Sequence, residues 1–407
     1  MGFEKLVFGK ADVHELLKEY GSPLYVYDEE ILRKRCQEMK NLIKYPRFRV
    51  NYSAKANTNV ELLKIIHSEG LDVDGMSPGE MYLEMKAGFT SDRITFIGNN
   101  VSRKELQFAV DNNILVSVDS LSQLKLLGEI NSGGSVCLRI NPGIGAGHHD
   151  KVITGGKKAK FGIAVEDLPQ AQKIAANCNM TITGLNQHIG SLFLESDAYI
   201  AAAEFILGLA AAIPSIEMVD LGGGFGIPYR HGAEPRLDLE GMGEKLDQLV
   251  NTWVSSNRPI TIRTEPGRYV AAECGALVGT VTSVKENYNT YFVGTDIGFN
   301  TLVRPVMYDS YHEISVVPQE ERSYKEYDKP VYVVGNICES GDILSHDRVL
   351  PCCKEGDALI VHDAGAYGFA MASTYNSRPL PAEVLIEKNG GVRLIRKAQT
   401  LADLWPD

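Results

Sequence analysis

A lysine with small neighbours stands at the end of a stretch that is typical of a β-strand. In VNYSAKAN (50–57), Val50, Tyr52 and Ala54 alternate with polar residues, and Lys55 follows between two alanines. Alternation with a period of two indicates a strand. A lone lysine at a strand end is most often a solvated surface charge. At the mouth of an α/β barrel, however, a lysine can attack a carbonyl carbon and form a Schiff base, and small neighbours leave room for a flat ligand.

The sequence LGGGFG (221–226) is a second candidate, because three consecutive glycines follow a strand-like run. The simplest interpretation is a flexible turn. Backbone N–H groups with no side chains around them also form a cradle for an anion, and phosphate is the usual ligand. A dinucleotide-binding interpretation is poor, because these glycines follow the seventh strand-like run and not the first.

Glu265 in TEPGR (264–268) is a third candidate. An ion pair within a loop would account for these residues equally well. A carboxylate beside a bound aromatic nitrogen would instead keep that nitrogen protonated. A Schiff-base lysine, an anion cradle and an acidic partner for a pyridinium nitrogen are together what pyridoxal 5'-phosphate requires, so the three features predict that cofactor.

Histidines near the expected barrel mouth are candidates for contact with a cofactor or for a metal site. His188 ends a strand-like run and could stack on the cofactor ring, although a packed or capping histidine is the commoner case. His148 and His149 are adjacent, so they cannot share one face of a strand, and no H-x-H pattern occurs at a strand end. A metal site is therefore not expected.

Eight strand-like runs must position these side chains, and amphipathic helical stretches separate most of them. The runs are RVNYSAK (49–55), LDVDGMS (71–77), ITFIGN (94–99), LVSVDS (115–120), SVCLRINP (135–142), MTITGLNQHIG (180–190), EMVDLGGGFG (217–226) and PITIRTEPGR (259–268). Alternating strands and helices predict a parallel sheet. Eight units over about 220 residues favour a (β/α)8 TIM barrel over an open doubly wound sheet. The carboxyl ends of the strands of such a barrel carry the active site.

The pattern changes after residue 270. Strand-like runs such as TYFVGTDIG, PVYVVGNIC and DALIVHDAG follow one another with few helical patterns between them. This predicts a second, all-β domain, a sandwich or a barrel. SPLYVYD (22–28) is one more strand, which could pair with that domain. The expected domains are an α/β barrel over 28–270 and a β domain made of 1–27 and 271–407.

Bulk properties exclude several classes of protein. The 407 residues carry a net charge of −11, which argues against nucleic-acid binding. No stretch approaches the roughly 20 apolar residues that cross a membrane, and the N-terminus lacks the apolar core of a signal peptide. The seven cysteines are irregularly spaced, which is typical of reduced thiols in a cytoplasmic protein.

The motifs, in their order along the chain, resemble the fold-type III pyridoxal-phosphate-dependent decarboxylases, and among these most closely the diaminopimelate decarboxylases. The resemblance covers nearly the whole chain and rests on YSAKAN, LRINPGIGAGHHDKVITGGKKAKFGI, HIGS, LGGGFGIPY, EPGR, DIGFNTLVRPVMYDSYHEI, CESGD and GAYGFAMASTYNSRPLPAEVL. It implies an alanine racemase-like barrel followed by a β domain. The implied reaction is decarboxylation of meso-2,6-diaminopimelate to L-lysine and CO₂, the last step of lysine biosynthesis.

The resemblance also assigns roles to residues of this sequence. Lys55 would form the Schiff base, His188 would stack on the ring, and Cys338 would donate a proton after decarboxylation. In the family the CESGD loop crosses a dimer interface, so Cys338 and Glu339 would serve the other subunit's site in a homodimer. Cofactor binding is expected at Lys55, His188, Ser191, Gly223, Gly224, Glu265, Gly267, Arg268 and Tyr367. Substrate binding is expected at Arg268, Arg304, Tyr308, Glu339 and Tyr367.

The sequence departs from what is common in the family at three places. Leu192 and Phe193 follow HIGS where many relatives have a glutamine or glycine, Asp309 replaces a frequent glycine, and Asn336 replaces a frequent proline. Each lies beside the expected site, so these changes bear on substrate tolerance or rate and not on cofactor binding. The lysine-rich GGKKAKFG loop (155–162) is either a solvated loop or a lid.

Three other functions stay open at this point. The same scaffold decarboxylates ornithine, arginine or carboxynorspermidine, but the long match in the β domain and in the lysine-rich loop favours diaminopimelate. A racemase would share the barrel but not the β-domain motifs. A cofactor-free binding protein would have lost the lysine or the thiol, whereas Lys55 and Cys338 are both present.

Overall fold

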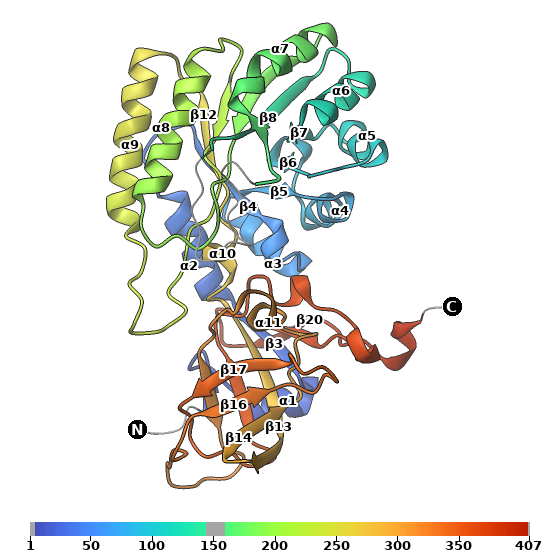
Figure 1. Cartoon of the computed structure of the whole chain (residues 1–407), viewed down its shortest axis with the longest axis vertical. Helices are drawn as coiled ribbons and strands as arrows, with labels where there is room; N and C mark the ends of the chain where they lie inside the picture. The colour runs from blue at the N-terminus through green and yellow to red at the C-terminus, as the bar shows by residue number, and fades with distance from the viewer. Residues whose placement is uncertain (1–4, 144–158, 406–407) are drawn as a thin grey trace. The chain divides into compact units, whose positions relative to one another are not determined.

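The computed structural model describes residues 5–143 and 159–405. The chain divides into two compact units (Figure 1). Unit 1 comprises Met1–Arg33, Tyr229–Glu234 and Ala271–Asp407. Unit 2 comprises Lys34–Pro228 and Pro235–Val270. The short segment Tyr229–Glu234 thus belongs to unit 1 although the residues on both sides of it belong to unit 2.

Unit 2 is a closed parallel barrel. Its strands are β4 (Phe48–Ser53), β5 (Asp72–Gly75), β6 (Ile94–Phe96), β7 (Leu115–Val118), β8 (Ser135–Asn141), β10 (Thr181–Asn186), β11 (Met218–Asp220) and β12 (Thr261–Thr264). Each pairs in parallel with the next in this order, and β12 pairs with β4, which closes the sheet. The short β9 (Ile163–Ala164) adds a bridge to β8. The predicted (β/α)8 barrel is therefore confirmed.

Helices surround the barrel strands (Figure 1). They are α3 (Val60–Ser68), α4 (Pro78–Ala87), α5 (Arg103–Asp111), α6 (Leu121–Ile130), α7 (Leu168–Asn177), α8 (Asp197–Ala211) and α9 (Leu239–Ser256), with α2 (Glu29–Lys40) before β4 and α10 (Arg268–Ala271) after β12. Local sequence sets their ends. In α4 the Ser77 side chain accepts from the Glu80 N–H, Pro78 opens the first turn, and Gly88 ends the helix with a left-handed φ of 106°.

Unit 1 is built on a mixed sheet in the order β17-β16-β14-β13-β3-β19-β20. These strands are β3 (Leu24–Asp28), β13 (Gly275–Asn287), β14 (Thr290–Thr295), β16 (Val331–Val334), β17 (Ile343–Arg348), β19 (Ala382–Ile386) and β20 (Val392–Arg396). β18 (Ala358–Val361) pairs with β13 and with β15 (Ile314–Val317). Since β3 pairs with β13 and β19, the strand expected at 22–28 joins the C-terminal sheet.

The N-terminal part of unit 1 is not all-β. After β1 (Leu6–Val7) and β2 (Ala11–Asp12) the chain forms helix α1 (Val13–Tyr20), which the sequence analysis did not predict. Val13 and Leu16 of this amphipathic helix are buried in one cluster with Leu24, Val278 and Ile360 of the sheet. One further short helix, α11 (Arg304–Tyr308), carries two of the expected site residues.

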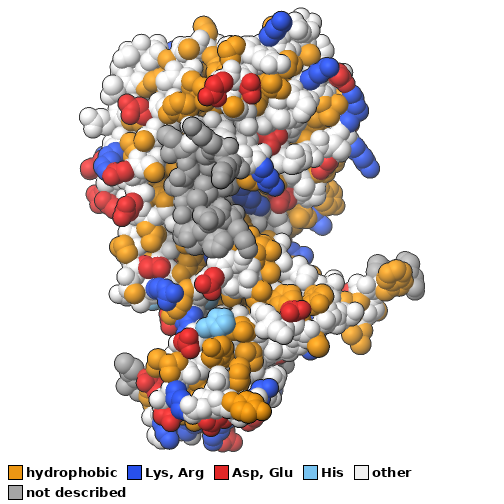
Figure 2. Space-filling model, viewed as in Figure 1, with side chains coloured by type: hydrophobic (Ala, Val, Ile, Leu, Met, Phe, Trp, Pro, Cys, Tyr) orange, Lys and Arg blue, Asp and Glu red, His pale blue; other side chains and the backbone are white. Residues whose placement is uncertain are grey.

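Two features of the described residues, their surface charge and the character of their helices, concern classes that the composition argued against. On the face shown in Figure 2, acidic and basic side chains of the described residues are interspersed, whereas nucleic-acid binding needs a concentrated basic surface. Within residues 5–143 and 159–405, no helix has the length and apolar character needed to cross a bilayer. All seven cysteines lie in these ranges, and none of them forms a disulfide.

Candidate active site

Lys55 lies just beyond the end of β4. The strand ends at Ser53, and Lys55 sits in the single 3₁₀ turn Ala54–Ala56 that follows. The sequence analysis extended the strand to Lys55, but the Ser53 N–H already bonds to the Pro266 carbonyl at 3.2 Å, outside the regular ladder. Ala54 and Ala56 are fully buried and the lysine is half-buried. The amine is thus held at the carboxyl end of the barrel.

A buried carboxyl group, Asp74, lies next to this lysine. The Ser53 hydroxyl bonds to both carboxylate oxygens of Asp74, at 3.1 and 3.0 Å. Burial raises the pKa of Asp74 to about 8, although the positive charge of Lys55 acts in the opposite direction. Ser53 and Asp74 therefore support the strand end that presents the lysine.

Glu265 follows β12 and is only 5% exposed. The Asn186 side chain donates to its Oε1 at 3.0 Å, which fixes the carboxyl group. Burial, and next the carboxyl groups of Asp220 and Asp74, raise the pKa of Glu265 well above its ordinary value. A carboxyl group that retains its proton in this way can share it with a basic ring nitrogen placed beside it.

The glycine turn that follows β11 passes close to other backbone segments. A Cβ on Gly223 would stand 1.9 Å from the Glu265 carbonyl oxygen, and one on Gly224 would stand 2.3 Å from the Gly190 oxygen. Gly224 also has a left-handed φ of 106°. The Gly222 N–H bonds to Asp220 Oδ1 at 2.9 Å, and the Tyr199 hydroxyl donates to the Gly222 carbonyl at 2.8 Å. Only glycine allows this close approach.

His188 is joined directly to this turn. The Gly223 N–H donates to His188 Nδ1 at 3.1 Å, so Nδ1 carries no proton. Burial, and then the charges of Lys55 and Arg139, lower the pKa of His188 well below its ordinary value. The ring is therefore neutral, and its 3.9 Å approach to Glu265 Oε2 is not an ion pair. A neutral, fixed imidazole is suited to lie against an aromatic ring.

Arg268 connects the loop after β12 with the loop after β10. Its Nη2 donates to the Ser191 hydroxyl at 3.0 Å, and Arg268 is only 7% exposed. Gly267 precedes it at the start of α10. The structure thus brings together eight expected cofactor residues in unit 2, which are Lys55, His188, Ser191, Gly223, Gly224, Glu265, Gly267 and Arg268.

The remaining expected residues lie in unit 1. Arg304 is 2% exposed, and its guanidinium bonds to His312 Nε2 at 2.7 Å. Tyr308, four residues later, ends helix α11. Tyr367 has a left-handed φ of 57° in the loop after β18.

Cys338 and Glu339 are exposed in the loop between β16 and β17. Asp342 organises this loop, since its carboxylate accepts from the Ile337 and Phe299 N–H groups, both at 2.7 Å. The Cys338 N–H bonds to Asn376 Oδ1 at 2.8 Å. The loop therefore presents the thiol outward from unit 1.

The three departures have local structural settings. Leu192 and Asp309 have left-handed φ angles of 66° and 52°, a conformation that favours glycine, and Asp309 caps the end of α11. Phe193 bonds through its N–H to the Gly224 carbonyl at 3.1 Å and packs on Phe225, so it supports the glycine turn. The Asn336 carbonyl accepts from Arg378 at 2.9 Å.

Two further expectations concern the adjacent histidines with the lysine-rich loop, and the lack of a metal site. His148, His149 and residues 155–158 of the lysine-rich loop lie outside the described residues. Within the described residues no group of three or more His, Cys, Asp or Glu side chains is arranged to hold a metal.

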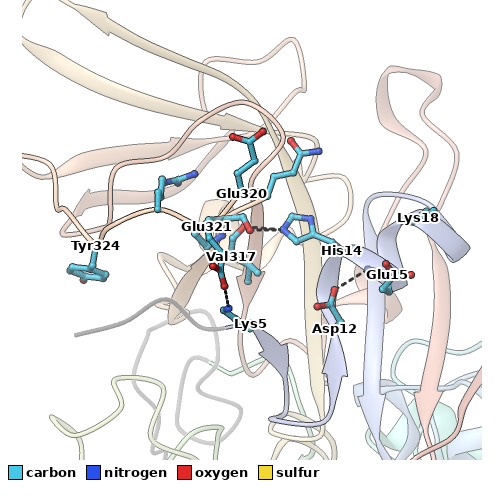
Figure 3. A pocket seen from close by; sticks show the side chains of 12 residues that line it. Lys5, Asp12, His14, Glu15, Lys18, Val317, Glu320, Glu321 and Tyr324 are labelled. Carbon is cyan, nitrogen blue, oxygen red and sulfur yellow. Dashed lines mark hydrogen bonds and ion pairs between the residues drawn. The ribbon is translucent and has the colours of Figure 1, made fainter.

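A large cavity of unit 1 lies apart from the residues expected in the active site. A cavity of about 1040 Å³ is lined by residues of the N-terminal segment and of the stretch that follows β15, and none of the expected site residues is among them. Figure 3 shows His14 pointing at the Val317 carbonyl, at 3.2 Å, within this cavity.

Sequence analysis missed the polar residues that support the expected ones. Asp74, Asn186 and Asp220 are each within two residues of the carboxyl end of a barrel strand and are buried. Because polar groups are rarely buried without a role, a polar residue at the end of an otherwise apolar strand was the available signal.

The chain matches the model of a protein family described as "Pyridoxal-dependent decarboxylase, pyridoxal binding domain" over residues 29–272. It is 42% identical to the diaminopimelate decarboxylase of Methanothermobacter thermautotrophicus, over 98% of this chain and 94% of that protein. It is 35% identical to the diaminopimelate decarboxylase of Escherichia coli K12, over 95% of this chain and 93% of that protein.

Solved structures agree with these sequence comparisons. The crystal structure of diaminopimelate decarboxylase from Helicobacter pylori complexed with L-lysine superimposes with a TM-score of 0.87. The match has 32% sequence identity and covers 96% of this chain and 98% of that one.

Proposed function

Because the chain belongs to the pyridoxal-dependent decarboxylases, and among them to the diaminopimelate decarboxylases, we propose that it converts meso-2,6-diaminopimelate to L-lysine and CO₂ with pyridoxal 5'-phosphate as cofactor. The protein is then a carboxy-lyase acting in lysine biosynthesis. The observation that carries the proposal is the convergence of Lys55, the glycine turn with His188, and the buried Glu265 at one end of a single barrel.

The residues of unit 2 fit the cofactor part by part. Lys55 Nζ would hold its aldehyde carbon, and the flat, neutral ring of His188 would lie against its pyridine ring. The glycine turn with Ser191 and Arg268 would hold its phosphate, because backbone N–H groups and a guanidinium are phosphate donors. When bound, pyridoxal phosphate supplies a sink for the electron pair that is released as CO₂ leaves.

Glu265 would hold a proton at the ring nitrogen. Its carboxyl group is fixed by Asn186, and burial, and next the surrounding acids, raise its pKa, so the proton is available to a base at that position. The same acids, Asp74 and Asp220, are buried and kept apart from water, which strengthens every charge interaction at the site. Gly267 lies between Glu265 and Arg268, in the connection from β12 to α10.

Unit 1 supplies the remaining groups in this proposal. Arg304, Tyr308 and Tyr367 would contact the substrate, and Glu339 would pair with an ammonium group. Cys338 Sγ would deliver a proton to the α-carbon after CO₂ has left. Selectivity would come from the distal amino acid end, because an arginine left without its carboxylate costs about 2–5 kcal/mol.

We further propose a homodimer in which Cys338 and Glu339 serve the site of the second subunit. In support, Cys338 and Glu339 are exposed, and the same unit exposes Val306 (41%), Met307 (41%) and Tyr375 (47%). Asn376 beside Tyr375 bonds to the Cys338 backbone, and Val306 lies 3.9 Å from a Cβ built on Gly341, so these apolar side chains surround the loop. Exposed apolar groups of this kind mark interfaces. Seven described cysteines that form no disulfide support a cytoplasmic location.

Turnover of meso-diaminopimelate and of ornithine decides the substrate. We expect the purified protein with pyridoxal phosphate to release CO₂ from diaminopimelate and to form L-lysine, with far slower release from ornithine. Faster reaction of ornithine would refute the assignment.

Mixing the Lys55→Ala and Cys338→Ala variants tests the shared site, because a mixed dimer regains one complete site only if the thiol comes from the other subunit. A mixture that stays inactive would contradict that arrangement.

A further inference from the structure

His312 occupies a position in unit 1 that fixes its protonation state. It is 1% exposed, and its Nδ1 lies 2.8 Å from the backbone carbonyl of His362. A carbonyl can only accept, so Nδ1 carries the hydrogen. Its Nε2 lies 2.7 Å from Arg304 Nη1, and a guanidinium can only donate, so Nε2 must be the unprotonated acceptor. Both contacts together select the neutral imidazole with its hydrogen on Nδ1.

The surroundings hold both partners in place. The Arg304 guanidinium carbon lies 4.6 Å from the centre of the Tyr229 ring, and this ring meets His312 edge-on at 5.2 Å. The His312 carbonyl accepts from Arg348 Nη2 at 2.8 Å. The guanidinium is therefore positioned by the Tyr229 ring on one side, by the imidazole acceptor at Nη1, and by the Ser310 hydroxyl, which accepts from Nη2 at 3.4 Å; an arginine has five N–H donors in all.

We propose that His312 is a positioning residue that orients the Arg304 guanidinium toward the carboxylate at the distal end of the substrate. This inference rests on the proposed function, because it takes Arg304 as the arginine that binds that carboxylate. His312 touches neither substrate nor cofactor in this scheme and acts only through Arg304. Its acceptor nitrogen binds the N–H group of Nη1 and, together with the Ser310 hydroxyl at Nη2, holds the plane of the guanidinium.

Two inhibitors that differ at the distal end isolate this role. L-lysine retains the distal carboxylate of the substrate, and cadaverine lacks it. We expect His312→Leu to raise the inhibition constant of L-lysine by about tenfold, the effect of one charge-assisted hydrogen bond, and to change that of cadaverine by less than about twofold. His312→Gln, which keeps an acceptor near the Nε2 position, should restore most of the L-lysine affinity.

Matched variants separate the possible failures. His362→Leu removes a neighbouring ring that bonds to Ser315 at 2.8 Å but keeps the carbonyl that His312 uses, so both inhibitors should bind it as they bind the native enzyme. His312→Asn, which withdraws the acceptor by shortening the side chain, keeps the test open if the leucine variant does not fold. If His312→Leu and His312→Asn weaken the binding of both inhibitors equally, or weaken the binding of neither, the inference is overturned.

Arg304→Met tests the proposed function independently. It should weaken L-lysine at least as much as His312→Leu does. If Arg304→Met leaves the ratio of the two inhibition constants unchanged, the assignment of Arg304 to the substrate fails. If the ratio of the two inhibition constants changes in Arg304→Met but not in His312→Leu or His312→Asn, only the positioning role of His312 fails.

Discussion

Replacement of Glu84 by glutamine should change how the stability of unit 2 depends on pH. Glu84 lies in α4, is 0% exposed, and neither of its carboxylate oxygens has a hydrogen-bond partner among the described residues. Its Oε1 would be only 2.8 Å from a Cβ at Gly75. Burial, and next the neighbouring carboxyl groups of Asp74 and Glu80, raise the pKa of Glu84 to about 9.

The sign and size of the effect follow from linkage. An acid whose pKa is raised from 4.5 to about 9 by folding keeps its proton in the folded state, while the unfolded chain loses it. The contribution of Glu84 to native stability is therefore greatest below pH 4.5 and falls as the pH rises toward 9. At 1.36 kcal/mol per pKa unit, the Glu84 contribution falls by about 4 kcal/mol between pH 5 and pH 8. Glutamine does not titrate, so Glu84→Gln lacks this contribution.

Urea unfolding of the cofactor-loaded enzyme, followed by tryptophan fluorescence, measures the effect. Trp253 lies in α9 of the same unit as Glu84, whereas Trp405 in unit 1 is already 85% exposed, so the fluorescence change reports mainly on unit 2. The buried amide of Glu84→Gln lowers the free energy of unfolding by about 1–3 kcal/mol at every pH. The test is therefore how the free energy of unfolding changes with pH, and not its value at one pH. The exposed Glu204→Gln variant in α8 is the control and should follow the native protein. If the free energy of unfolding changes with pH in the same way in Glu84→Gln and in the native protein, the reasoning is refuted.

Other predictions concern the cofactor site and unit 1. Lys55→Ala should lower turnover by at least about 10²-fold, and borohydride should no longer fix the cofactor to the chain; native turnover would contradict the role of Lys55. Gly223→Ala should cost about 1–3 kcal/mol of stability and weaken cofactor binding, measured by equilibrium titration, because the added Cβ would stand 1.9 Å from the Glu265 carbonyl; unchanged affinity would refute the close approach. His231 bonds to Asp363 at 2.8 Å, and this bond raises the pKa of His231. The stabilisation is present below the ordinary pKa and is lost as the pH rises through the raised one. His231→Gln should therefore lower the free energy of unfolding by under about 1 kcal/mol near pH 6, after solvent screening, and should not change it near pH 9. An equal loss at both pH values would count against the ion pair.

The barrel and several of its reactive ends could be predicted from sequence because both depend on local order. Period-two runs that alternate with amphipathic stretches specify β/α units, and parallel strands bring their carboxyl ends to one edge. Lys55, the glycines at 222–224, and Glu265 each follow such a run directly, so their proximity followed from the fold class.

Other features could not be predicted, because they depend on what packs around a residue and not on its neighbours in sequence. Helix α1 is capped by Asp12, but its 8 residues are too few to be stable alone, and the sheet core that receives Val13 and Leu16 completes its stabilisation. The short segment at 229–234 joins unit 1 through contacts such as the one between Tyr229 and Arg304, which are 75 positions apart in the printed sequence.

Sequence alone determined the fold class, the lysine that would hold the cofactor, and the run of glycines that allows backbone segments to approach one another closely. The tertiary structure decided which groups keep their protons. The raised pKa of Glu265, the neutral ring of His188 and the single tautomer of His312 all arise from burial and from partners distant in sequence. The physical reason is that desolvation and Coulomb interactions depend on distances in space, which the order of residues does not give.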